Sequence, residues 1–148
     1  MNTEKDQYFV AVKIFLEDKE GNFLITKDRF GDWDIPGGRL RQNDFDADLD
    51  AVVRRKISEE LGSELAYELG EPIVFMRHER NEILASGERQ PRRIFAIGYE
   101  AIYGGGEVKL GKNHTEYKWV SLSDFKPEEF FTGGWLKGVR EYMARKKK

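Results

Sequence analysis

The stretch Trp33–Ser63, WDIPGGRLRQNDFDADLDAVVRRKISEELGS, puts a turn-forming Pro-Gly-Gly in front of a helical pattern that is apolar on one side. Pro36 is followed by two glycines, which permit unusual backbone angles and a close approach to a neighbouring strand. Helical spacing begins near Asp48, with Asp46 or Asp48 as the candidate N-cap, and it ends at Gly62. One half of this helix carries the apolar side chains that predict packing on a sheet: Leu49, Val52, Val53, Ile57 and Leu61.

Glu60 falls inside the apolar half of this helix. A buried carboxylate without a partner costs several kcal/mol, so Glu60 requires a nearby positive charge. Lys56 lies one turn earlier, and a structural Lys56 to Glu60 ion pair is one solution. A metal ion is the other, because a main-chain carbonyl of the Pro-Gly-Gly turn can face the helix across a narrow gap. Hard oxygen ligands of this kind suit Mg²⁺ or Mn²⁺ bound together with substrate phosphates.

The remaining segments predict strands around this helix and a second helix near the end of the chain. Tyr8 to Lys27 has the pattern of a β-hairpin, and RIFAIGYEAIY is apolar on both faces, which predicts a central strand. PIVFMR and YKWVSL predict further strands, whereas the charged segment from His78 to Arg93 predicts a solvated loop. Trp135 to Met143 has helical spacing with a packing stripe. We therefore expect one domain over residues 1–148, an α/β or α+β sandwich with a mixed sheet.

The composition excludes several classes of protein. The chain has 148 residues, a formal net charge of -2 and no cysteine, so we expect neither a disulfide scaffold nor a global field that attracts nucleic acid. No apolar run is long enough to span a bilayer, and the N-terminus lacks the apolar centre of a signal peptide. We therefore expect a cytoplasmic protein without a membrane partner, and a homodimer stays open.

The segment GG...RRKISEELGS resembles the signature box of the Nudix (MutT-like) hydrolases. In that box, Gly, five residues, Glu, seven residues and Arg-Glu-aliphatic-any-Glu-Glu-any-Gly-aliphatic form a loop, a helix and a loop. The resemblance implies an α/β/α sandwich that cleaves a nucleoside diphosphate linked to another moiety, as in a nucleotide sugar, ADP-ribose or a nucleoside triphosphate. It also implies Mg²⁺ or Mn²⁺ held by Glu59, Glu60 and the Gly38 carbonyl, with Arg55 orienting a box carboxylate.

This chain departs from the box at three places. Counting forward from Gly38 puts Asp44 at the first glutamate position, whereas counting back from Arg55 puts Ala47 there, which indicates a three-residue insertion. Lys56 replaces the glutamate that follows the arginine, and Ser63 replaces the closing aliphatic residue. An ammonium group repels additional metal ions or substitutes for one of them. The alternative to an active enzyme is therefore a catalytically silent Nudix fold that binds a nucleotide or a protein.

The replaced glutamate leaves the catalytic base to be found elsewhere. His114 stands five residues before Trp119, a spacing similar to that of the GDP-mannose mannosyl hydrolases, which are Nudix relatives that use a histidine base. This resemblance leaves attack at a sugar carbon open. We expect His114 as the base and Glu116 as a metal ligand or the alternative base. Arg29, Arg77 and Arg93 are the candidates for binding the diphosphate of a nucleotide-derived substrate.

Overall fold

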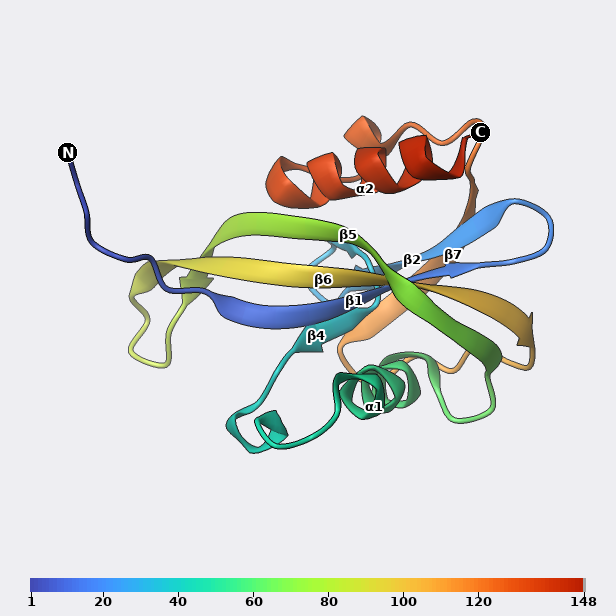
Figure 1. Ribbon diagram of the computed structural model, residues 1–148, viewed down its shortest axis with the longest axis horizontal. Helices are drawn as coiled ribbons and strands as arrows, with labels where there is room; N and C mark the ends of the chain where they lie inside the picture. Colours follow the sequence, from blue (N-terminus) through green and yellow to red (C-terminus); the bar gives the residue numbers. More distant parts are fainter. Residues whose placement is uncertain (148) are drawn as a thin grey trace.

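A mixed β-sheet lies between two helices in the computed structural model, which describes residues 1–147. Helix α1 (Leu49–Leu61) covers one face of the sheet and helix α2 (Gly133–Lys146) covers the other, as Figure 1 shows. The predicted α/β/α sandwich is therefore confirmed. The strands and the short 3₁₀ turns are β1 (Phe9–Glu17), β2 (Asn22–Asp28), β3 (Trp33–Asp34), β4 (Gly37–Arg39), η1 (Gln42–Asp44), β5 (Ala66–Ile83), β6 (Arg89–Gly105), β7 (His114–Ser121) and η2 (Pro127–Glu129).

The sheet combines one parallel pair with several antiparallel pairs. The strand order is β3-β2-β1-β6-β5, with β4 paired to β1 and β7 paired to β2. Strand β6 runs parallel to β1 and antiparallel to β5, so the prediction that this apolar segment is central is confirmed. The start of β1 pairs with β4, whereas β2 pairs with β7 along its length. Because β1 and β2 share little pairing, the sheet curls and brings β4, α1 and β7 toward one another.

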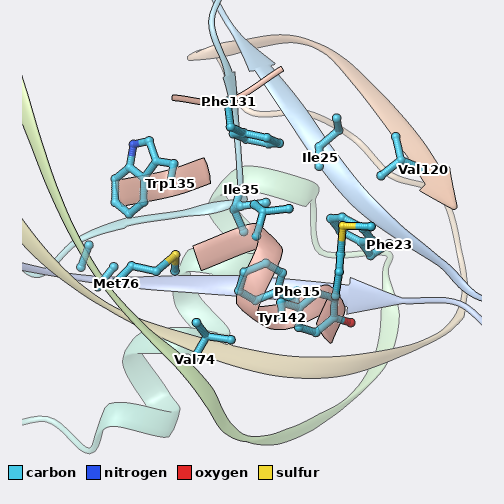
Figure 2. Close-up of a cluster of buried hydrophobic side chains, with 14 of the residues drawn as sticks. Phe15, Phe23, Ile25, Ile35, Val74, Met76, Val120, Phe131, Trp135 and Tyr142 are labelled. Atoms are coloured by element: carbon cyan, nitrogen blue, oxygen red, sulfur yellow. The ribbon is translucent and has the colours of Figure 1, made fainter. Parts of the chain in front are cut away.

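Alternation along the strands divides the core between the two faces of the sheet. On the α2 side, Phe15 stacks on Tyr142 with ring centroids 4.2 Å apart, and Phe23 meets the edge of the same ring (Figure 2). On the α1 side, most of the predicted apolar half of the helix packs against alternate residues of β1. The prediction is wrong for Leu49, the first residue of α1, which is 41% exposed. The buried residues of this second cluster are Val12, Ile14, Leu16, Leu24, Val52, Val53, Ile57, Leu61, Leu65, Tyr99 and Ala101.

Helix α2 approaches β5 so closely that glycine is required at the contact. A Cβ atom on Gly134 would meet the carbonyl oxygen of Arg77, and one on Gly138 would meet the Met76 side chain. The Nδ1 atom of His78 accepts hydrogen bonds from the backbone N–H groups of Gly134, at 3.0 Å, and of the following residue, at 3.3 Å. A side chain of β5 thereby satisfies orphan donors at the start of α2.

Two sequence predictions about local structure are wrong. The segment from His78 to Arg93 is not a loop, because β5 continues to Ile83, β6 begins at Arg89, and only a short turn joins them. The alternating positive and negative charges prevented recognition of this hairpin in the sequence. Strand β5 is an edge strand whose side chains are largely solvated and show no apolar alternation. Strand β7 also begins earlier than expected, at His114, so that His114 and Glu116 belong to the strand and not to the loop before it.

The other predicted elements are confirmed. Strands β1 and β2 form the expected hairpin, and α1 starts after Asp48 and ends at Gly62, whose φ of 93° favours glycine. Asp48 occupies the N-cap position without a side-chain hydrogen bond to the helix. Within the described part of the chain, neither helix has the length and apolar character needed to cross a membrane.

Candidate active site

A cleft of about 740 Å³ opens on the sheet where β1, β4, the β5–β6 hairpin and β7 meet. Its volume is in the range of pockets that hold small-molecule ligands. The residues that line it come from every part of the fold: Ala11, Lys13, Asp28, Arg29, Phe30, Asp32, Asp34, Gly37, Gly38, Arg39, Glu60, Arg80, Asn81, Glu82, Ile83, Arg89, Ile94, Asn113, His114 and Trp135.

The Pro-Gly-Gly turn reaches the cleft because its first glycine fits tightly against β1. Gly37 has a φ of 139°, and a Cβ atom there would meet the Val12 carbonyl oxygen and the Cα of Lys13. This contact supports the predicted close approach of the backbone. It places Gly38 next to α1, where a Cβ atom on Gly38 would lie 3.3 Å from the Lys56 ammonium nitrogen.

Glu60 meets His114 across the space between α1 and β7. The Oε2 atom of Glu60 lies 2.9 Å from Nδ1 of His114, and the two side chains are 15% and 6% exposed. The contact with Glu60 raises the pKa of His114, although burial opposes this change. The Lys56 to Glu60 ion pair that the sequence left open is not formed, since Glu60 contacts His114 instead.

Lys56 is a buried cation beside this pair. The residue is 7% exposed, and among residues 1–147 no carboxylate forms an ion pair with its ammonium group. Burial lowers the pKa of Lys56, while the charges of Glu59 and Glu60 oppose that change. The lysine therefore brings positive charge to the position where Gly38 faces the helix.

Glu59 belongs to a different cluster, near the C-terminal end of α1. Its carboxylate accepts hydrogen bonds from Arg41 at 2.9 Å and from Arg55 at 3.0 Å. Arg55 also holds Asp44, the residue at the insertion, with both of its terminal nitrogens. These hydrogen bonds keep the pKa of the Asp44 carboxyl group well below its ordinary value. Arg55 thus contacts a box carboxylate, and Glu59 does not line the cleft.

The remaining predicted residues are dispersed. Glu116 is exposed on β7, with its nearest ammonium group, on Lys27, at 3.8 Å, and it lies outside the cleft lining. Arg29 does line the cleft, where its guanidinium lies 5.0 Å from the centre of the Phe30 ring. Arg77 and Arg93 line a separate hollow beside α2. The structure therefore brings Gly38, Glu60, His114 and Arg29 together and leaves the other candidates outside.

Several polar residues of the cleft were missed at the sequence level. Lys13 interrupts the apolar pattern of β1, and its ammonium donates to Asp34 at 3.0 Å and to the Ile35 carbonyl at 3.2 Å. The same ammonium lies 4.9 Å from the centre of the Trp135 ring. A lysine inside an otherwise apolar strand was the feature of the sequence that could have identified Lys13 as a cleft residue. Asn113, next to His114, carried no such signal and is found only through the curl of the sheet.

The donor set of the cleft fits one divalent cation held together with substrate phosphates. No group of three or more His, Asp or Glu side chains in residues 1–147 converges into a metal cage. Mg²⁺ does not need such a cage, because it commonly uses one or two carboxylates, water and substrate phosphates. The partly buried Glu60 carboxylate, the Gly38 backbone and the Asn113 amide supply oxygen atoms of the required hardness.

The fold agrees with the comparison with known proteins. The model of the NUDIX domain family matches residues 7–137, so the chain belongs to the Nudix family.

Relatives of known name resemble this chain at low identity, in sequence or in structure. The nucleoside triphosphatase NudI of Escherichia coli K12 is 27% identical over 111 residues, which cover 71% of this chain and 77% of NudI. The crystal structure of a MutT protein from Methanosarcina mazei has a TM-score of 0.73 at 24% identity, covering 99% of this chain and 100% of that chain. An ADP-ribose pyrophosphatase from Streptococcus suis has a TM-score of 0.64 at 18% identity, covering 96% and 94%.

Proposed function

We propose that this Nudix protein is a Mg²⁺- or Mn²⁺-dependent hydrolase that cleaves a nucleoside diphosphate linked to another group. The observation that carries the proposal is the convergence of Gly38, Glu60 and His114, from three distant segments, on one cleft. The candidate substrates are nucleoside triphosphates, ADP-ribose and nucleotide sugars. The names of NudI and of the Streptococcus suis enzyme support the first two of these classes.

The roles of the cleft residues follow from their chemistry. Glu60 and the Gly38 backbone would hold the cation, which supplies Lewis acidity and a more acidic bound water. His114 is held by its contact with Glu60 and would move a proton between the attacking water and the leaving group. Lys13 is neutralised by Asp34 and would keep the floor of the cleft rigid. Arg29 would bind phosphate oxygens at the opening of the cleft.

The test is turnover of a substrate panel with Mg²⁺ and Mn²⁺, followed by product analysis. The panel contains nucleoside triphosphates, ADP-ribose, nucleotide sugars and dinucleoside polyphosphates. On the best substrate, Glu60→Gln should lower kcat/KM at least about 100-fold, a loss near 2.7 kcal/mol. Glu64→Gln is the matched control, because Glu64 pairs with Lys109 on the exposed surface. Near-parental activity of Glu60→Gln at saturating Mg²⁺ contradicts the assignment.

His114→Gln tests the proton-transfer role on the same substrate. The expected result is a decrease in kcat of about 100-fold or more with a small change in KM. Glu116→Gln serves as the comparison, because Glu116 lies on the same strand and outside the cleft. If Glu116→Gln loses more activity than His114→Gln, the base is Glu116 and not His114.

A second candidate function is nucleotide binding without catalysis. It is favoured by the buried Lys56 and by the lack of a three-carboxylate cage in residues 1–147. A catalytically silent protein would bind members of the panel and release them unchanged. Lys56→Glu restores the carboxylate of the family box and should increase the number of Mn²⁺ ions bound, as counted by electron paramagnetic resonance. Unchanged Mn²⁺ stoichiometry would show that Lys56 does not limit metal loading.

A further inference from the structure

The β5–β6 hairpin carries charged side chains on both of its faces. Ion pairs fully balance the positive charge on only one face. Arg93 and Glu79 are cross-strand partners, and the Arg93 guanidinium donates to Glu79 at 2.9 Å and to Asp6 at 2.5 Å. Two carboxylates therefore surround this arginine. Because side chains alternate along a strand, Arg80 and Arg92 project from the opposite face of the same hairpin.

The opposite face has a surplus of positive charge. Arg80 and Arg92 are direct cross-strand partners, an arrangement of like charges that destabilises a sheet. Arg39 of β4 adds a third guanidinium, and burial together with the charges of Arg80 and Arg92 lowers its pKa. Glu82 forms an ion pair with Arg39. In residues 1–147 no ion pair is formed by Arg80 or Arg92, so three guanidinium groups share one carboxylate.

Packing against an aromatic ring restricts two of these arginines, Arg39 and Arg92, whereas Arg80 is exposed. The guanidinium carbons of Arg39 and Arg92 lie 5.0 and 5.4 Å from the centre of the Phe9 ring. Contact with the same ring brings these two guanidinium groups near one another. Arg39 and Arg80 line the cleft that also contains Glu60. Arg39 follows Gly38 directly, so the surplus charge adjoins the proposed metal end of the cleft.

We propose that Arg39, Arg80 and Arg92, the hairpin arginine cluster, bind a phosphate group of the substrate's polyphosphate chain. The planar guanidinium group matches phosphate oxygens in a bidentate geometry. A bound phosphate would also relieve the repulsion between the cross-strand arginines. This inference rests on the proposed hydrolase function. It specifies substrates whose phosphate chain extends from Gly38 toward the hairpin.

The test measures binding without metal and without turnover. Isothermal titration of the full chain with inorganic tripolyphosphate should show a dissociation constant at least about tenfold weaker for Arg80→Gln and for Arg92→Gln than for the parent. Arg145→Gln is the matched control, because this substitution removes the same charge from an exposed position in the last turn of α2. Arg80→Lys keeps the charge without the fork and should lose part of the affinity.

Several results would overturn the proposal. One is equal tripolyphosphate affinity in Arg80→Gln, Arg92→Gln and Arg145→Gln. Another is sulfate binding as tight as tripolyphosphate binding, which would indicate general attraction of anions. The outcome is separable from that of the proposed function. If tripolyphosphate binding depends on Arg80 but the protein turns over no substrate, the phosphate-binding role of the cluster is supported and the proposed hydrolase function is contradicted. Turnover of nucleoside triphosphates with an unchanged KM in Arg80→Gln does the reverse.

Discussion

Replacing Lys56 by methionine should stabilise the protein. Transfer of an ammonium group from water to a protein interior costs several kcal/mol before compensation, and Lys56 is 7% exposed. The charges around it offer little net compensation, because Glu59 and Glu60 attract the ammonium while Arg41 and Arg55 repel it. Methionine has a similar length and fills the same space without a charge.

The magnitude follows from this balance. With the surrounding charges largely cancelling, we expect Lys56→Met to raise the free energy of unfolding by about 1–2 kcal/mol. In a domain of this size each kcal/mol moves the unfolding midpoint by about 2–4 °C, so the midpoint should rise by about 2–8 °C. Urea denaturation followed by circular dichroism measures the free energy, and calorimetry measures the midpoint.

The control is Lys137→Met on the exposed side of α2, which removes a solvated lysine from a helix and should change the free energy by less than about 0.5 kcal/mol. A decrease in stability of about 1 kcal/mol or more in Lys56→Met would contradict this prediction, because it would mean that the ammonium group makes a favourable interaction in the fold. Activity measured alongside separates stability from function. Lower turnover in a more stable variant would show that the buried charge serves the reaction.

Three further perturbations test the supports of the fold. Burial lowers the pKa of His78 in the folded state, so the unfolded chain takes up the proton first as pH falls below about 6.5. The parent should therefore lose stability below that pH, by up to about 1.4 kcal/mol per pH unit, whereas His78→Gln keeps an acceptor for α2 and should lack this slope in urea titrations. Gly138→Ala places a methyl group against a buried methionine of β5 and should cost about 1–3 kcal/mol by the same assay. The hydrogen bonds from Arg55 lower the pKa of Asp44, so the stability that this pair contributes is present above about pH 3.8 and is lost as pH falls below it. Asp44→Asn should have a lower unfolding midpoint at pH 6, and its deficit should narrow below pH 3.8; a deficit that does not depend on pH would contradict the pairing.

Local patterns were sufficient for much of the fold. The apolar half of α1 and the close approach at Gly37 follow from spacing and residue type, which act within one segment. The sequence did not predict the β5–β6 hairpin, because each of its strands is stabilised by backbone hydrogen bonds to the other strand. The charged composition of the segment does not reveal these bonds. Arg93 was a reasonable phosphate ligand by residue type, but its cross-strand neighbour Glu79 and the distant Asp6 neutralise it.

The resemblance of the box segment indicated the family and the α/β/α architecture, and family resemblance also made Gly38, Glu60 and His114 candidates. These patterns lie within short segments, so they can be recognised without the fold. The contact of Glu60 with His114, and those of Glu59 with Arg41 and Arg55, become apparent in the folded chain alone. Contacts between distant segments depend on strand register and on the curl of the sheet. Both are set by how the whole chain buries its apolar faces, and no single segment encodes them.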